Sequence, residues 1–226
     1  MSSIKAVILA AGKGTRLNSE SAQIPKAMRT VCGKPLLHYV LNAIDFIDRR
    51  DVVVVVGFLK EQIIEAFPSL AYVEQKDLNG TGGAAACAGE FILSGDFTGD
   101  VLILCGDTPL LKRDTLQSLA ETHRVKGNDC TVLTCEINEN LELGRIIRGT
   151  DGSFDRILES KECPESLRYI HEYNTGVMIY NARKLYDKIT SLDNKNKGKE
   201  LYLTDVPKLF KEAGYKVGLF VTGDKK

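Results

Sequence analysis

Two short apolar runs separated by a helical pattern constrain the fold of this chain most strongly. The first run covers residues 4–9 (IKAVIL) and the second covers residues 51–57 (DVVVVVG). Continuous apolar runs of this length predict strands that are buried on both faces of a sheet. Between them, residues 35–47 (PLLHYVLNAIDFI) repeat apolar side chains at helical spacing. The order strand, helix, strand predicts parallel pairing through a crossover helix.

The same alternation continues along the rest of the chain. Further helical patterns cover residues 59–66, 82–92, 114–124, 182–190 and 204–213. Further strand patterns cover residues 71–74, 101–105, 130–136, 176–180 and 216–221. Since crossovers between parallel strands are right-handed, the pattern predicts an α/β fold with a Rossmann-like, doubly wound, mainly parallel sheet. Residues 137–175 are richer in charge and turns and predict a small inserted lobe.

Composition and charge exclude several classes of protein. The 226 residues carry 30 basic and 30 acidic side chains, so no net charge draws the chain to a nucleic-acid polymer or a membrane surface. Gly12 and Lys13 break the N-terminal apolar run well short of an export signal or a membrane span, which predicts a cytoplasmic protein. The 6 cysteines form no C-x-x-C pair and the 3 histidines lie far apart, so neither a disulfide framework nor a zinc site is expected.

A glycine-rich segment follows the first predicted strand and is the strongest functional signal. It comprises Leu9, Ala10, Ala11, Gly12, Lys13, Gly14, Thr15 and Arg16. Glycines at such a turn let backbone N–H groups approach a phosphate, while Lys13 and Arg16 supply positive charge. The P-loop pattern does not fit, and the dinucleotide fingerprint needs a small residue where Leu17 stands. For this segment taken alone, an ordinary strand-to-helix turn stays open as the alternative.

Two further motifs extend this signal in a fixed order. Pro25-Lys26 follows the glycine-rich segment, and Gly33-Lys34-Pro35-Leu36 opens the next predicted helix. Together these motifs resemble the sugar-nucleotide pyrophosphorylase family of nucleotidyltransferases. The resemblance is closest to the uridylyltransferase domain of the family's bifunctional members, which form UDP-N-acetylglucosamine. It runs from residue 4 to about residue 221, nearly the whole chain.

The resemblance implies a role for each group of matching residues. The residues expected to bind the nucleotide and the sugar are Leu9, Ala10, Ala11, Gly12, Lys13, Gly14, Gln75, Gly80, Thr81, Gly106, Gly144, Glu159 and Asn174. Asp107 is the expected Mg²⁺ ligand, and Arg16 and Lys26 are the expected catalytic cations. Taken alone, Asp107 also suits a turn or a helix cap, Glu159 a surface carboxylate, and Asn174 a tight turn.

The resemblance also implies the reaction and its partners. A nucleoside triphosphate and a sugar 1-phosphate would react with release of pyrophosphate, with Mg²⁺ as cofactor; UTP and N-acetylglucosamine 1-phosphate are the favoured pair. Two alternatives stay open: a pyrimidine nucleotidyltransferase that uses dTTP or CTP and another acceptor, and a nucleotide-binding protein that has lost catalysis. We expect one nucleotidyltransferase domain over residues 1–226, with a nucleotide-binding part at about 1–136 and a sugar-binding lobe at about 137–180.

The chain departs from the family pattern at several places. The stretch between Arg16 and Lys26 is longer than usual, Leu143 stands where an aromatic residue is usual, and Leu201 interrupts an E-Y-Y pattern. The last two departures bear on the identity of the sugar. The sequence has no hexapeptide repeats, so neither the acetyltransferase half of the bifunctional members nor its trimerising surface is expected, and we expect a monomer or a weak oligomer.

Overall fold

The computed structural model describes residues 3–14 and 21–223. The helices are α1 (Leu36–Ala43), α2 (Lys60–Ala66), α3 (Thr81–Cys87), α4 (Gly89–Leu93), α5 (Arg113–Lys126), α6 (Ala182–Lys188) and α7 (Val206–Glu212). The strands are β1 (Ile4–Leu9), β2 (Thr30–Val31), β3 (Lys34–Pro35), β4 (Val52–Val56), β5 (Ala71–Glu74), β6 (Asp100–Cys105), β7 (Cys130–Glu136), β8 (Arg145–Arg148), β9 (Phe154–Leu158), β10 (Glu172–Asn181) and β11 (Val217–Thr222). Every segment with a predicted strand pattern forms a strand.

The main sheet follows the strand order β11-β7-β10-β6-β1-β4-β5. Strand β1 pairs in parallel with β4 and β6, β4 pairs in parallel with β5, and β7 pairs in parallel with β11. Strand β10 lies between β6 and β7 and is antiparallel to both. The predicted α/β fold with a mainly parallel sheet is therefore confirmed, with β10 as the strand on this path that runs against its neighbours.

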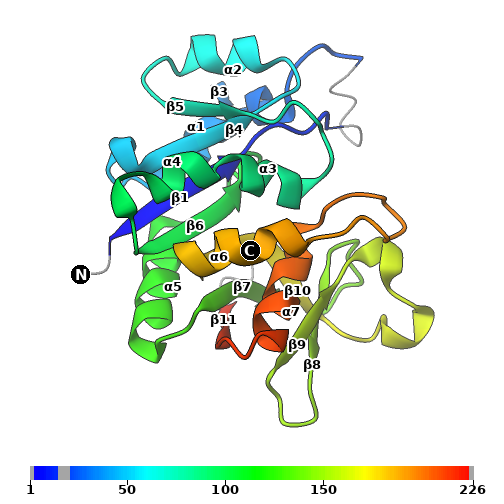
Figure 1. The fold of residues 1–226 in the computed structure, drawn as a ribbon. Coiled ribbons are helices and arrows are strands. Elements are labelled where there is room, and N and C mark those ends of the chain that lie inside the picture. Colours follow the sequence, from blue (N-terminus) through cyan, green and yellow to red (C-terminus); the bar gives the residue numbers. More distant parts are fainter. Residues whose placement is uncertain (1–2, 15–20, 224–226) are drawn as a thin grey trace.

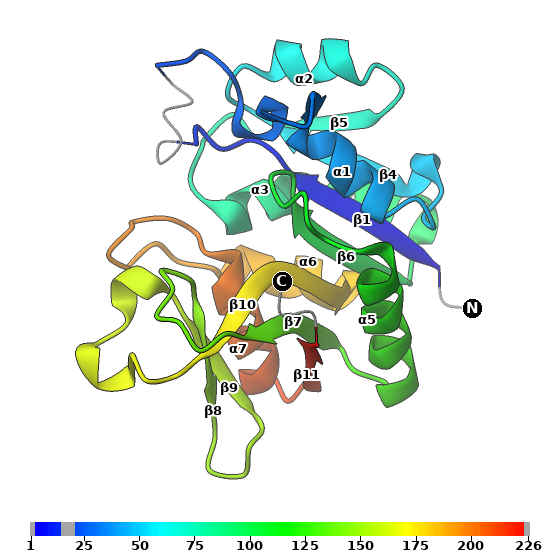
Figure 2. The same cartoon turned by 180° about the vertical axis from the view of Figure 1, so that it is seen from behind.

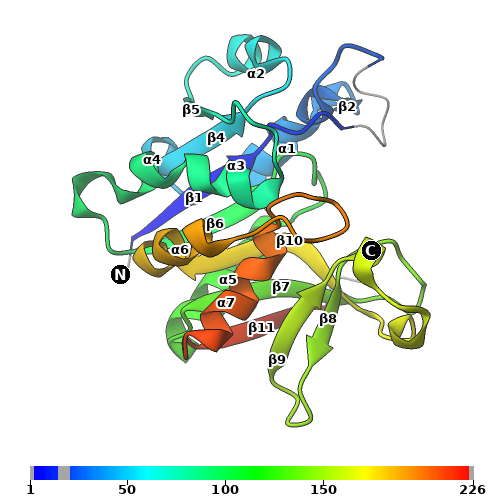
Figure 3. The same ribbon diagram turned by 45° about the vertical axis from the view of Figure 1, so that its right-hand side comes forward.

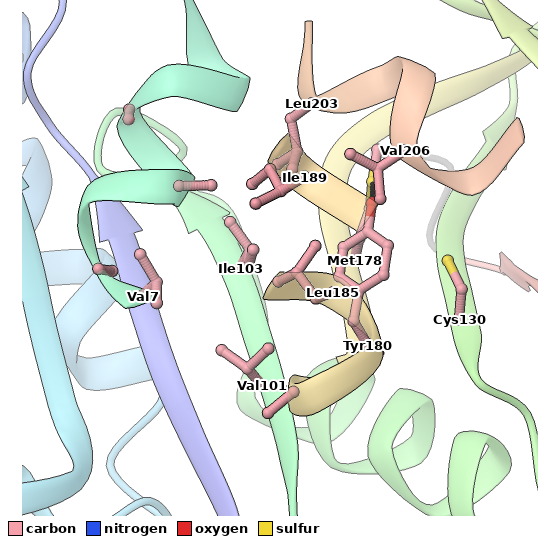
Figure 4. Close-up of a cluster of buried hydrophobic side chains, with 14 of the residues drawn as sticks. Val7, Val101, Ile103, Cys130, Met178, Tyr180, Leu185, Ile189, Leu203 and Val206 are labelled. Atoms are coloured by element: carbon pink, nitrogen blue, oxygen red, sulfur yellow. Dashed lines mark hydrogen bonds between the residues drawn. The ribbon is translucent and has the colours of Figure 1, made fainter. Parts of the chain in front are cut away.

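Helices cover both faces of the sheet, as the two opposite views show (Figures 1 and 2). On one face, Val7 of β1 belongs to a core cluster with Leu185 of α6 (Figure 4). On the other face, Ile8 belongs to a cluster with Leu116 of α5. Because successive side chains of a strand point to opposite faces, the continuous apolar run of β1 supplies both clusters.

The segment predicted as an inserted lobe contains a hairpin that the sequence pattern did not resolve. Strands β8 and β9 pair antiparallel, and the hairpin joins the sheet where Tyr173 of β10 pairs with Arg145 of β8. Figure 3 shows the hairpin reaching away from the layered part of the molecule. Strand β10 has a register shift between Asn174 and Met178, beside this junction. The division into a nucleotide-binding part and a sugar-binding lobe stays a prediction.

The predicted helix over residues 82–92 is two helices in the structure. Helices α3 and α4 meet at Ala88, whose ψ of -3° departs from helical values. At the break Gly89 lies against Tyr186, and a Cβ on Gly89 would lie 3.0 Å from the tyrosine ring. Among the helices of the described residues, none is long and apolar enough to cross a lipid bilayer.

Candidate active site

The carboxyl ends of β1, β4, β5 and β6 meet at one edge of the sheet, and predicted site residues directly follow β1, β5 and β6. The Ala10 N–H donates to the Val55 carbonyl (2.8 Å), and the Gln75 N–H donates to the Val56 carbonyl (2.8 Å). These bonds continue the sheet pairing past the strand ends. They bring the glycine-rich segment beside Gln75, at the edge where open parallel sheets bind ligands.

A first cavity of about 600 Å³ opens at this edge. The predicted residues that line it are Leu9, Ala10, Ala11, Gly12, Lys13, Gly14, Lys26, Gln75, Gly80, Thr81 and Asp107. The remaining lining residues are Ala27, Leu78, Ala84, Cys105 and Glu200. Gly106 is buried behind this lining, where its N–H donates to the Leu9 carbonyl (2.9 Å). Arg16 lies outside the described residues.

Lys26 and Asp107 form an ion pair inside the first cavity. Lys26 begins a 3-10 turn (Lys26–Met28), and the next residue, Ala27, is buried. This turn is anchored by the bond from the Met28 N–H to the Pro25 carbonyl (2.9 Å). The cation and the carboxylate that the sequence assigns to phosphate and to metal therefore contact each other directly.

The side chain of Gln75 is held in a fixed orientation and is buried. Its Nε2 donates to Asn79 Oδ1 (3.0 Å) and to the Gly80 carbonyl (3.0 Å). Both amide N–H groups are thereby used, so Oε1 is the polar atom left to accept a hydrogen bond in the cavity.

Gly80 and its neighbours are joined to a distant segment of the chain. The Leu201 N–H donates to the Asn79 carbonyl (2.7 Å), and the Gly82 N–H donates to the Leu201 carbonyl (2.7 Å). Gly80 has φ of +111°, and a Cβ there would lie 2.6 Å from the Leu201 carbonyl oxygen. A glycine is therefore required at this position on both steric and conformational grounds.

A second cavity of about 300 Å³ adjoins the first and shares Thr81 and Glu200 with it. The residues predicted to bind the sugar, Gly144, Glu159 and Asn174, all line it. The remaining lining residues are Glu142, Leu143, Ser160, Lys161, Thr175, Gly176 and Tyr202. The predicted residues converge, since a Cβ on Gly144 would lie 3.7 Å from Glu159 Oε1 and 3.8 Å from Asn174 Cβ. A side chain at Gly144 would narrow this cavity.

Comparison with known proteins shows the family of this chain. A family model described as the MobA-like NTP transferase domain matches residues 6–207. The chain belongs to this family. The bifunctional protein GlmU of Streptomyces avermitilis is 40% identical over 225 residues, which cover 97% of this chain and 46% of the relative. GlmU of Pelotomaculum thermopropionicum is 40% identical over 218 residues, covering 96% of this chain and 47% of the relative.

The chain thus spans about half the length of these curated relatives. A solved structure of a candidate glucose-1-phosphate thymidylyltransferase from Bacillus anthracis, in complex with sucrose, is similar with a TM-score of 0.73. The match covers 98% of this chain and 87% of that chain at 16% identity, so it shows the shared fold.

In this member of the NTP transferase family, Thr204 and Asn174 form hydrogen bonds that order the second cavity. Thr204 Oγ1 donates to Glu159 Oε1 (2.7 Å), which fixes one oxygen of that carboxylate. Asn174 Oδ1 accepts from the Gly176 N–H (3.1 Å), so the asparagine side chain does stabilise a tight turn. The turn uses only Oδ1, so the two N–H groups of Asn174 Nδ2 remain able to donate hydrogen bonds in the cavity. Thr204 and Glu200 were not predicted as site residues, although the departure at Leu201 drew attention to their segment.

Cys105 lies at the end of β6, between the two halves of the site. Burial raises the pKa of its thiol to about 12, and the nearby Asp107 carboxylate adds to this shift. The thiol is therefore neutral at physiological pH. A neutral thiol is a poor nucleophile and a poor metal ligand, so nothing in this environment activates the cysteine.

Proposed function

We propose that this chain transfers a nucleotidyl group from a nucleoside triphosphate to a sugar 1-phosphate and releases pyrophosphate. The observation that carries the proposal is the pair of adjoining cavities that share Thr81 and Glu200. The first contains a glycine-rich segment and Lys26, which suit phosphates. The second contains a fixed carboxylate and amide groups, which suit hydroxyl groups of a sugar. A reaction that joins these two ligands would occur at the border between the cavities.

Positioning and charge neutralisation would account for catalysis. An oxygen of the sugar phosphate would form a bond to the α-phosphorus while the bond from that phosphorus to the bridging oxygen of the pyrophosphate breaks. Two anions approach each other and negative charge accumulates on the leaving group. Lys26 and Lys13 line the first cavity and would neutralise phosphate oxygens there. Arg16 is proposed to act with them.

Asp107 is the residue proposed to hold Mg²⁺. Among the described residues there is no group of three or more His, Cys, Asp or Glu side chains that could hold a metal ion. A single carboxylate fits Mg²⁺ because this ion keeps several waters and takes substrate phosphates as ligands. When bound, the ion would neutralise and orient phosphate oxygens. The ion pair with Lys26 uses Asp107 Oδ2, so Oδ1 remains for the metal, and the bound cation would repel the lysine ammonium toward phosphate.

The orientation of Gln75 supports a pyrimidine base with a donor at N3. Its Oε1 can accept a hydrogen bond from the N3–H of uracil, and thymine carries the same group. UTP is the proposed substrate from the family resemblance, and dTTP is the second candidate that this geometry favours. A protein that only binds nucleotides would not need Lys26 and Asp107 together in the cavity.

A screen for pyrophosphate release tests this proposal. UTP, dTTP, CTP, ATP and GTP are each combined with N-acetylglucosamine 1-phosphate, glucose 1-phosphate and glucosamine 1-phosphate in the presence of Mg²⁺. We expect UTP with N-acetylglucosamine 1-phosphate to give a kcat/KM about tenfold above any other pair. A different pair that wins by that margin would overturn the substrate assignment, and no release with any pair would overturn the reaction class.

A further inference from the structure

Arg145 is buried without a counter-ion. It is 2% exposed and begins β8, directly after Gly144 of the second cavity. Across residues 3–14 and 21–223, no carboxylate forms an ion pair with it. Arg148 on the same strand differs, since its Nε pairs with Glu172 Oε2 at 2.7 Å. A buried unpaired cation is costly, so the contacts of Arg145 must offset part of the lost hydration, although its buried Nε has no hydrogen-bond partner among the described residues.

The contacts of Arg145 are concentrated on the residues just before Gly144. Its Nη2 donates to Asn140 Oδ1 and to the Leu141 carbonyl (3.3 Å), and its Nη1 approaches the Leu143 carbonyl (3.4 Å). The guanidinium also lies over the ring of Tyr173, 5.2 Å from the ring centroid. The planar guanidinium of arginine has several N–H donors in fixed directions and can reach these acceptors at once, whereas the ammonium group of lysine cannot.

Tyr173 holds the same segment with its hydroxyl group. The hydroxyl donates to the Glu139 carbonyl (2.7 Å) and accepts from the Leu141 N–H (3.1 Å). Residues 139–143, which we call the 139–143 loop, are thus bound by two buried side chains of neighbouring strands. The loop contributes Glu142 and Leu143 to the second cavity.

We propose that Arg145 is a positioning residue that holds the 139–143 loop in place, so that the wall of the second cavity is formed before a sugar phosphate binds. Arg145 is not among the lining residues of that cavity and acts through the loop. A wall that is already ordered lowers the entropy cost of binding and of reaching the reactive geometry. The part of this inference that concerns sugar binding rests on the proposed function.

The test compares Arg145→Met with Arg156→Met, which removes a guanidinium from β9 of the same hairpin. Arg156 is 42% exposed and pairs with the partly exposed Asp155, so its loss leaves no buried charge unpaired. Hydrogen exchange at the amides of residues 139–144 is measured in the free proteins. We expect exchange to be faster by about tenfold or more in Arg145→Met and unchanged in Arg156→Met. The KM for the sugar 1-phosphate should rise about tenfold in Arg145→Met, while the KM for the nucleotide stays within about twofold.

Two milder variants keep the inference falsifiable if Arg145→Met does not fold. Arg145→Lys keeps the positive charge but loses the guanidinium donors. Tyr173→Phe loses the hydroxyl while keeping the ring under the guanidinium. Both should raise exchange in the 139–143 loop. Unchanged exchange in these variants, or an equal rise of both KM values, would overturn the inference. If the wild type shows no transferase activity, the proposed function fails, and the exchange data alone decide whether Arg145 orders the loop.

Discussion

Lys26 and Asp107 are the residues on which the chemical account depends most directly. Their ion pair places a cation and a carboxylate in the lining of the first cavity, where the side chains are 40% and 19% exposed. A divalent cation on the same carboxylate would repel the lysine ammonium. Binding of a metal together with a nucleotide would therefore move Lys26 toward the phosphates. The position of the Lys26 ammonium is thus linked to the binding of the metal at Asp107.

Replacing Lys26 tests its role at the reacting phosphate. We expect Lys26→Ala to lower kcat by about 10²-fold or more, because it removes one electrostatic stabiliser of the transition state. Its thermal stability should change little, since the lysine is partly exposed. Steady-state kinetics and thermal unfolding check both statements.

Lys211→Ala is the matched control for Lys26→Ala. Lys211 forms an ion pair with Asp155 at 2.7 Å, and its side chain is 42% exposed, but it lines neither cavity. Its loss should leave kcat unchanged. An unfolded Lys26→Ala variant would show that Lys26 is structural, and a folded one with the turnover of the control would show that it is peripheral to catalysis.

The sequence predicted which residues line the site better than it predicted how they contact one another. The family resemblance led to the residues of both cavities. Ala10, Gln75 and Gly106 also follow strands that the apolar pattern predicts, whereas Gly144 and Glu159 flank β8 and β9, which it did not predict. The Lys26–Asp107 pair could not be predicted, since it depends on how a 3-10 turn packs against the sheet. Arg145 belongs to the Gly144-Arg145-Ile146 motif of the family resemblance, but its burial could not be predicted, because a buried arginine and an exposed one look alike in a single sequence.

Strand β1 shows that an apolar pattern can predict an element without revealing the contacts of a residue within it. The apolar pattern correctly predicted a buried strand, yet Lys5 within it is also buried. Lys5 Nζ donates to the Ile92 carbonyl (3.0 Å) and the Phe91 carbonyl (3.3 Å) at the C-terminal end of α4, and it lies 4.6 Å from the Phe97 ring centroid. The lysine thus donates to two helix-end carbonyls, of which the Phe91 carbonyl also accepts a hydrogen bond from Ser94 Oγ (2.8 Å).

Lys5→Met should therefore destabilise the protein although methionine suits a buried strand. The substitution leaves the Phe91 and Ile92 carbonyls without this donor, at a cost of about 1–3 kcal/mol in the free energy of unfolding. Lys216→Met is the control, because Lys216 Nζ also bonds a helix-end carbonyl, that of Lys126, but is exposed. The free energy of unfolding of the control should fall by less than about 0.5 kcal/mol. Urea denaturation measures the free energy of unfolding of both variants, and equal losses would contradict the account.

At the scale of the whole molecule, alternation of strands and helices predicted the class of fold, because crossover rules leave few topologies for such a pattern. It did not predict that β10 runs against its neighbours or that β8 and β9 form a hairpin. Both features depend on the charged segment between β7 and β10, where apolar periodicity is weak. The order of that segment comes from long-range contacts such as those of Tyr173, which local patterns do not encode.

The central claim is that the α-phosphorus of the nucleotide is transferred to a sugar 1-phosphate. The most direct test uses UTP labelled with heavy oxygen at the non-bridging positions of its α-phosphate, incubated with N-acetylglucosamine 1-phosphate and Mg²⁺, with products analysed by mass spectrometry. The account predicts that the label appears in a nucleoside diphosphate sugar and that the pyrophosphate is unlabelled. Labelled UMP or UDP without any labelled sugar nucleotide would contradict it, because the nucleotide would then have been hydrolysed or would have donated a different phosphoryl group.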